Sequence, residues 1–137
     1  MNYDNCYVAS VSMGANYAQT FNAIKEAEAH KGPSVIIAYS TCINHGIDMS
    51  NGMKTMKNAV DSGYWINYRR RPATGDKPAE FILDSAEPKM PYKDFIANET
   101  RYVSLTKSNP EAAARLADMA EKYAKRTYAK YKKIAEK

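Results

Sequence analysis

The first forty residues alternate between short apolar runs and one amphipathic stretch. Residues 7–12 mix β-branched and small residues and predict a strand, whereas residues 17–30 repeat apolar positions at helical spacing. Gly32-Pro33 ends that helix, and the apolar run at 35–39 predicts a second strand, which we expect to be buried. The succession of strand, helix and strand predicts a βαβ unit with parallel strands and a right-handed crossover.

Within the predicted helix, large apolar residues and charged residues occupy different positions. A candidate apolar face follows helical spacing and consists of Tyr17, Phe21, Ile24 and Ala27, or alternatively of Ala18 and Ala29. Glu26 and its charged neighbours are expected to face outward. Asn16 precedes the helix and is a candidate N-cap, because its side chain can accept a hydrogen bond from the first turn.

The middle of the chain predicts a short helix followed by two short strands. Residues 53–62 repeat apolar positions at helical spacing and precede a glycine. Residues 64–69 alternate like a half-buried strand, and residues 81–84 predict a second strand, so a hairpin or long β-loop is expected between them. The basic triplet Arg69-Arg70-Arg71 is expected to be solvated.

The last third of the chain is mainly helical in pattern. A short helix is expected near residues 92–98, and residues 100–107 fit either a helix or an extended segment. Asn109 caps a long helix that begins at Pro110. Its apolar stripe, which includes Leu116, Met119, Tyr123, Tyr131 and Ile134, is expected to pack along a sheet or against a partner.

Together these elements predict an α/β fold. We expect a partial open parallel sheet with helices on its faces, a β-loop extension and a long C-terminal helix. Residues 1–107 are assigned to the α/β part, and residues 108–137 to the helix that packs on it.

Composition fits one soluble domain: the chain has 137 residues, of which 45% are hydrophobic and 26% charged. It contains no apolar run of about 18 residues and no apolar region after a basic start, so neither a membrane span nor a secretory signal is expected. Two cysteines do not make a disulfide framework, and a cytoplasmic location is expected.

The net charge of +5 resides in residues 107–137, which contain nine basic and four acidic side chains. Such a segment could contact nucleic acid or an acidic protein surface. We expect the solvated face of a terminal helix instead, and no nucleic-acid partner.

The polar loop after the second predicted strand is the candidate functional site. Cys42, Asn44 and His45 follow the strand and precede Gly46. In open α/β sheets, ligands bind beside the carboxyl ends of the strands. Cys42 therefore suits a nucleophile or a cluster ligand, although a buried free thiol is equally compatible with the residues alone.

A metal site formed by this chain alone is not favoured. Cys42 and His45 have the spacing of half a zinc site, and Cys6 is a possible third ligand. Zinc takes four ligands, usually in two spaced pairs, and His30 lies at the end of a helix. An iron–sulfur cluster takes four thiolates, and the chain has two cysteines. Cys6 lies in an apolar stretch and is interpreted as a small hydrophobic residue.

Several ordered motifs resemble the C-terminal end of pyruvate:ferredoxin (flavodoxin) oxidoreductase. The resemblance covers nearly the whole chain, and the motifs agree in their order and spacing. The segments that carry it are 8–16, 25–28, 32–40, 42–47, 62–65, 83–85, 87–88 and 101–102, together with the last helix, which is rich in Lys, Tyr and Ala.

The resemblance implies an enzyme that oxidatively decarboxylates pyruvate with coenzyme A, giving acetyl-CoA and CO2. It implies thiamine diphosphate with Mg, electron transport through [4Fe–4S] clusters, and ferredoxin or flavodoxin as the electron acceptor. Cys42 matches the distant fourth ligand of the cluster nearest the thiamine. Asn44 and His45 would then orient the loop and donate hydrogen bonds.

The resemblance also implies that much of the enzyme lies outside this chain. The thiamine-diphosphate motif and the three companion cluster cysteines are absent, so residues 1–107 would be the end of a thiamine-diphosphate-binding domain. Thr41 stands where many relatives have proline, and the segment after Ile47 is shorter than the glycine-rich linker that is usual in the family. We expect a fragment that is inactive alone and that joins the remainder of a homodimeric enzyme. The alternative is a stand-alone, non-catalytic binding or scaffold protein derived from that domain.

Overall fold

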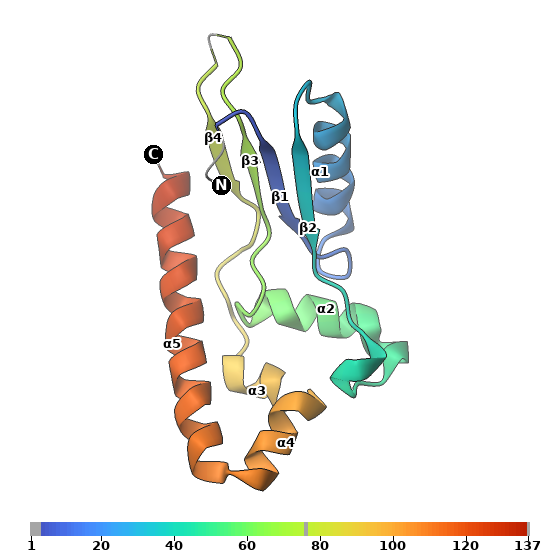
Figure 1. Ribbon diagram of the computed structural model, residues 1–137, viewed down its shortest axis with the longest axis vertical. Coiled ribbons are helices and arrows are strands. Elements are labelled where there is room, and N and C mark those ends of the chain that lie inside the picture. Colours follow the sequence, from blue (N-terminus) through green and yellow to red (C-terminus); the bar gives the residue numbers. More distant parts are fainter. Residues whose placement is uncertain (1–3, 76, 137) are drawn as a thin grey trace.

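A four-stranded open sheet forms the centre of the structure, a computed structural model that describes residues 4–75 and 77–136. The strands are β1 (Tyr7–Val11), β2 (Ser34–Ala38), β3 (Tyr68–Arg71) and β4 (Glu80–Leu83), in the order β2-β1-β3-β4 (Figure 1). β2 is parallel to β1, whereas β3 is antiparallel to both β1 and β4. The predicted α/β class and parallel β1–β2 pair are confirmed, and the sheet as a whole is mixed.

Helices cover the two faces of the sheet unequally. α1 (Tyr17–Ala29) lies against β1 and β2, and α5 (Pro110–Ala135) runs along β4 (Figure 1). α2 (Gly52–Asp61), α3 (Tyr92–Ile96) and α4 (Thr100–Ser108) gather beyond the carboxyl end of β2. Residues 100–107, for which the sequence allowed either a helix or an extended segment, are helical and belong to α4. None of the described helices is long and apolar enough to cross a membrane.

β1 is the buried central strand, and its alternating side chains separate two cores. Tyr7, Ala9 and Val11 face α1 and contact Ala23. On the opposite face, Val8 and Cys6 cluster with Tyr68, Phe81 and Tyr131, and this places α5 over the β3–β4 half of the sheet. Cys6 is buried directly before β1, as expected of a small hydrophobic residue.

The prediction that the apolar strand near residues 35–39 is buried was wrong for its main part. β2 forms the outer edge of the sheet, and Ser34, Val35, Ile37 and Ala38 are exposed. Only Ile36 packs against the α1 core. An apolar run indicates burial in a completed sheet, but it does not say which segment supplies the covering layer.

The predicted apolar face of α1 was also wrong for its large residues, although Ala27 packs against the core as predicted. Tyr17, Phe21 and Ile24 are exposed, whereas Gln19, Thr20 and Ala23 are buried against the sheet. Small and polar residues face inward because Gln19 donates hydrogen bonds to the Ser10 backbone oxygen and to Asp84, at 3.3 and 2.9 Å. The predicted cap is confirmed, because the Asn16 side chain accepts a hydrogen bond from Gln19 N.

A hairpin of β3 and β4 was predicted, but its first strand is Tyr68–Arg71 and not residues 64–69. The interpretation of its arginines was also wrong. Arg69 is largely buried and pairs with Asp84 at 2.7 Å and with Glu26 at 2.6 Å. Glu26, expected to face outward, points toward the sheet and also accepts from Arg71. Two apparently solvated charge groups therefore join α1 to the hairpin, because each supplies the counter-charge that the other needs.

α5 begins as predicted but packs through only part of its apolar stripe. The Asn109 side chain accepts a hydrogen bond from Ala112 N and caps the helix. Tyr131 packs on the sheet, and small residues contact the core around Tyr92, namely Ala117, Ala120 and Ala124. The larger side chains Leu116, Met119 and Tyr123 are exposed.

Candidate functional site

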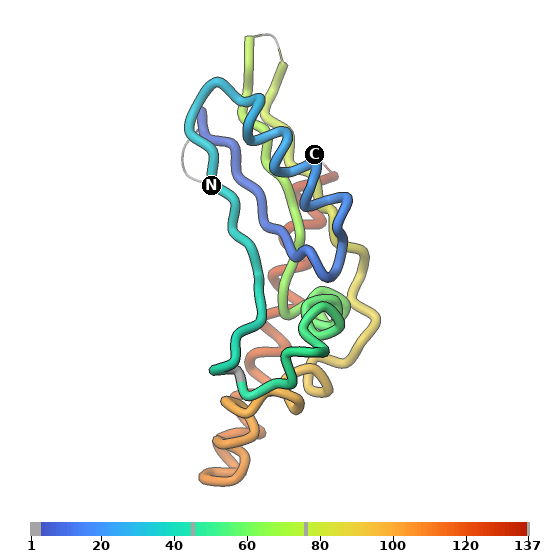
Figure 2. Tube along the Cα trace, turned by 90° about the vertical axis from the view of Figure 1, so that its right-hand side faces the viewer, coloured from blue at the N-terminus to red at the C-terminus, as the bar shows by residue number. Residues whose placement is uncertain are grey.

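The Cys42 loop leaves the carboxyl end of β2 and reaches α2 through two short 3-10 turns, Ile43–His45 and Met49–Asn51. Cys42 is exposed and carries a free thiol. Its backbone is extended, and the first 3-10 turn starts directly after it. Figure 2 shows the loop beside α4, at the end of the molecule where α2 to α4 gather.

The chain before Cys42 is fixed by a buried carboxylate. Tyr39 follows β2, and its hydroxyl donates to Glu99 Oε1 at 3.4 Å. Glu99 is wholly buried and accepts from Arg101 Nε at 2.6 Å. Burial and the charge of Glu99 raise the pKa of Tyr39, so this phenol remains a hydrogen-bond donor.

The chain after Cys42 is held by Thr100, which follows Glu99 at the start of α4. Thr100 Oγ1 donates to the Gly46 backbone oxygen at 3.0 Å. Gly46 has a left-handed backbone with φ of 67°, and a Cβ there would lie 2.0 Å from Thr100 Oγ1. Glu99 and Thr100 therefore hold the two sides of the loop, and only glycine fits at the second contact.

Two tyrosines contact Arg101, the partly exposed partner of the buried Glu99 carboxylate. Arg101 Nη2 donates to the Tyr64 hydroxyl at 2.8 Å, and the Tyr102 hydroxyl donates to the same oxygen at 3.2 Å. The Arg101 guanidinium also lies over the Tyr102 ring, 5.0 Å from its centroid. Sequence reasoning missed Glu99, Thr100 and Arg101, because they come 57 or more positions after Cys42 and no local pattern links them to it.

The other predicted residues of the loop are Asn44 and His45. The Asn44 side chain is exposed and makes no hydrogen bond to any described residue. The side chain of His45 lies outside the part of the structure that is described. Its predicted role in orienting the loop therefore stays a prediction.

Cys42 can supply one metal ligand but not a complete set. Within residues 4–75 and 77–136, no three His, Cys, Asp or Glu side chains come together in a way that could hold a metal ion. Cys6 precedes β1 at the amino end of the sheet, whereas Cys42 lies beyond the carboxyl end of β2. The free, exposed thiol fits a cluster whose remaining ligands come from another part of a protein.

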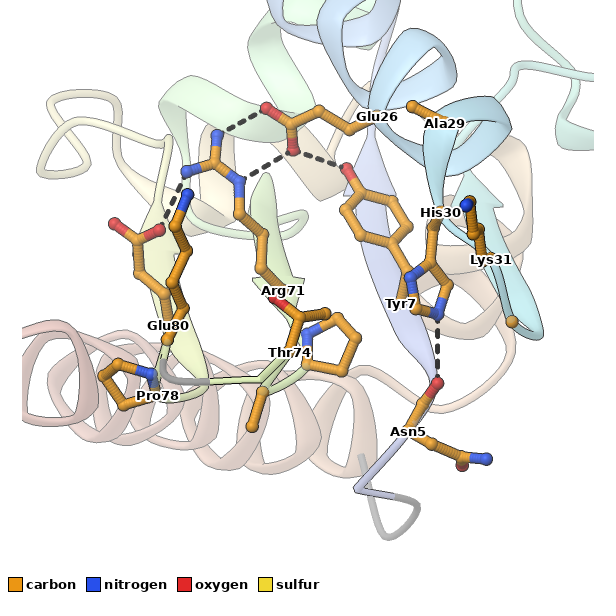
Figure 3. A pocket seen from close by; sticks show the side chains of 14 residues that line it. Asn5, Tyr7, Glu26, Ala29, His30, Lys31, Arg71, Thr74, Pro78 and Glu80 are labelled. Carbon is orange, nitrogen blue, oxygen red and sulfur yellow. Dashed lines mark hydrogen bonds and ion pairs between the residues drawn. The ribbon is translucent and has the colours of Figure 1, made fainter.

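Apart from the Cys42 loop, the structure has a hollow of about 850 Å³ at the amino ends of β1 and β2, far from Cys42 along the strands (Figure 3). Glu26 forms its wall and accepts from the Tyr7 hydroxyl at 3.0 Å and from Arg71 Nε at 3.2 Å. Arg71 also donates to Glu80 at 2.8 Å, and a ring nitrogen of His30 lies 3.0 Å from the Asn5 backbone oxygen.

The electrostatics of this hollow indicate a structural role. Burial raises the pKa of Glu26, but the hydrogen bond from Arg71 and the charge of Arg69 lower it by more than burial raises it. The pKa of Glu26 therefore lies below its ordinary value. The hydrogen bond and charge of Asp84 raise the pKa of Arg69. Because these charges neutralise one another, Glu26, Arg69 and Arg71 are engaged in joining α1 to the hairpin.

Comparison with known proteins gives consistent results. The chain is 47% identical over 137 residues to pyruvate:ferredoxin oxidoreductase of Moorella thermoacetica, covering 99% of this chain and 12% of the relative. It is 45% identical over 140 residues to pyruvate-flavodoxin oxidoreductase of Klebsiella pneumoniae, with 98% and 12% covered. The pyruvate-flavodoxin oxidoreductase of Trichormus variabilis is 50% identical over 119 residues, with 85% and 10% covered.

No family model matches the chain. The chain is nevertheless homologous, over nearly its whole length, to one segment of much longer oxidoreductases. It spans about 12% of the length of the first two relatives.

Proposed function

We propose that this chain is one segment of a pyruvate:ferredoxin or pyruvate-flavodoxin oxidoreductase, and that Cys42 supplies one thiolate to a [4Fe–4S] cluster. The observation that carries the proposal is the 47% identity over 137 residues, combined with a free, exposed thiol at the carboxyl end of a strand. The parent enzyme would convert pyruvate and coenzyme A to acetyl-CoA and CO2. Its electrons would pass to ferredoxin or flavodoxin.

In this proposal the chain contributes one corner of the cluster site. The three other thiolates belong to the remainder of the enzyme, as do the groups that hold thiamine diphosphate and Mg. The cluster, when bound, carries single electrons. The chain itself binds one iron through Cys42, and Glu99 and Thr100 act as positioning residues that hold the thiolate in place.

The open apolar edge favours this proposal over a stand-alone scaffold protein. Val35 and Ile37 on β2, and Phe21 on α1, are exposed although their types are typical of a core. A scaffold that evolved to act alone would gain solubility by replacing them. A segment that joins the remainder of a homodimeric enzyme keeps them for contact.

The proposal is tested by anaerobic reconstitution with iron and sulfide. The chain is mixed with the Moorella thermoacetica enzyme from which the equivalent segment has been deleted. We expect a cluster spectrum with the wild-type chain, a weakened or altered one with Cys42→Ser, and no change with the control Cys6→Ala. A stable, stoichiometric [4Fe–4S] spectrum from the chain alone, or a silent Cys42→Ser, contradicts the proposal.

A further inference from the structure

On the α5 face of the sheet, the half that contains β2 is uncovered along this outer strand, whereas Val8 and Ser10 of β1 are buried. Tyr131 of α5 lies over Tyr68 of β3 and Phe81 of β4, with ring centroids 5.2 and 5.6 Å away. On the same face, Val35 and Ile37 of β2 are each 46% exposed. They share that face with Val8 and Ser10, their register partners in β1.

The exposed apolar side chains of α5 border the uncovered half. Leu116, Met119 and Tyr123 are spaced by three and four residues and therefore lie on one side of the helix. They line one groove of about 610 Å³ together with Ile37 and Ser10 of the sheet. The groove thus runs between α5 and β2, and its exposed walls are apolar.

An α-helix suits the two walls of this groove. With its side chains it has a diameter of about 10 Å, and from above β2 it would contact Ile37 on one side and Met119 on the other. A helix also satisfies its own backbone hydrogen bonds, whereas a loop would bring unpaired polar groups onto apolar walls.

The rim of the groove is basic. The Arg126 guanidinium lies over the Tyr123 ring, 5.6 Å from its centroid, and Arg115 Nη1 lies 3.8 Å from the Met119 sulfur. No carboxylate in the described part of the chain pairs with either arginine. A second copy docking through the same face would bring like charges together, which disfavours self-association.

We infer that the groove between α5 and β2 receives an amphipathic helix with acidic flanks, supplied by the remainder of the oxidoreductase polypeptide. This inference rests on the proposed function, because the matched relatives contain far more chain than this segment. The apolar side of that helix covers Ile37 and Met119. Its acidic residues pair with Arg115 and Arg126.

The test measures binding of the purified chain to the Moorella thermoacetica enzyme that lacks the equivalent segment. Met119→Glu places a charge in the groove, and we expect it to weaken binding about tenfold or more. Met53→Glu is the matched control, because Met53 of α2 is 57% exposed and Met119 is 56% exposed. The control should bind within about twofold of wild type, and circular dichroism should show that both variants are folded.

Photo-crosslinking from Met119→p-benzoylphenylalanine identifies the occupant. Attachment to a helical peptide with acidic flanks supports the inference, whereas attachment to a second copy, a strand or a loop overturns it. If the wild-type mixture assembles the cluster but Met119→Glu binds as tightly as Met53→Glu, this inference fails and the proposed function stands. If the wild-type chain neither binds nor supports a cluster, both fail.

Discussion

The two edges of the sheet are completed in different ways. At the β4 edge, Tyr131 covers the strand surface, and Arg69 balances both Asp84 and Glu26. At the β2 edge, the apolar side chains of the strand and of α1 are exposed, and so is Cys42 beyond it. The closed half pairs its charges and covers its apolar surface, whereas the open half exposes both apolar side chains and the Cys42 thiol. In the proposed function, the first half supports the fold and the second meets the remainder of the enzyme.

The largest expected contrast is in thiol reactivity. Under native conditions, a maleimide reagent should label Cys42 to completion while Cys6, which is 6% exposed, stays unlabelled. Cys6 can react only when β1 separates from its neighbours. Mass spectrometry of the labelled peptides measures both sites. Equal labelling rates would show that the closed half opens as readily as the loop.

Removing the positive charge of Arg69 should destabilise the closed half of the sheet. Arg69→Met leaves Asp84 and Glu26 without this partner, and we expect a loss of about 2–4 kcal/mol in the free energy of unfolding. Urea denaturation measures that loss. Arg115→Met is the matched control on the exposed surface of α5, and it should change stability by about 0.5 kcal/mol or less. Equal effects of the two variants would contradict the structural role of Arg69.

The Cys42 loop can be tested through two glycines with left-handed backbones. Gly46→Ala should cost about 1–2 kcal/mol for the backbone alone, and about 1 kcal/mol more because its Cβ meets Thr100. Gly75→Ala is the control, since φ there is 53° and no atom lies within 4 Å of the added Cβ. Urea denaturation gives both costs. If they are equal, Thr100 does not restrain the loop.

The smallest expected effect is a dependence of stability on acid pH. Because the folded-state pKa of Glu26 is lowered, its contribution is complete above the ordinary value of 4.5 and is lost as the pH falls below it. Glu26→Gln should therefore be less stable near neutral pH and lose stability less steeply in acid, by a fraction of one proton. Urea denaturation at several pH values measures the slope, and an unchanged slope would contradict the assignment.

The sequence predicted most helices and strands, but not which of their side chains face the core or pair with one another. The caps Asn16 and Asn109, the parallel β1–β2 pair and the β3–β4 hairpin depend on local patterns, so they were predictable. Arg69 and Glu26 were misinterpreted because their pairing joins segments 43 positions apart. Tyr17, Phe21 and Val35 were misplaced because a local apolar pattern does not say which side chains the rest of the fold covers.

The candidate site was predictable only in part. Cys42 could be found because it directly follows an apolar strand, where open α/β sheets collect ligands. The residues that hold its loop could not, since Glu99 and Thr100 act through the fold. The proposed ligand role of Cys42 remains a prediction for the reconstitution experiment.

The position of β2 also has a practical consequence for the isolated chain. The outer edge of this strand has unpaired backbone amides and carbonyls, and its sequence Ser-Val-Ile-Ile-Ala contains neither charge nor proline. Such an edge is a template on which strands of other molecules can add. Purified alone, the chain should therefore precipitate at high concentration as β-rich aggregates, and a strand that occupies the edge of β2 should keep it in solution.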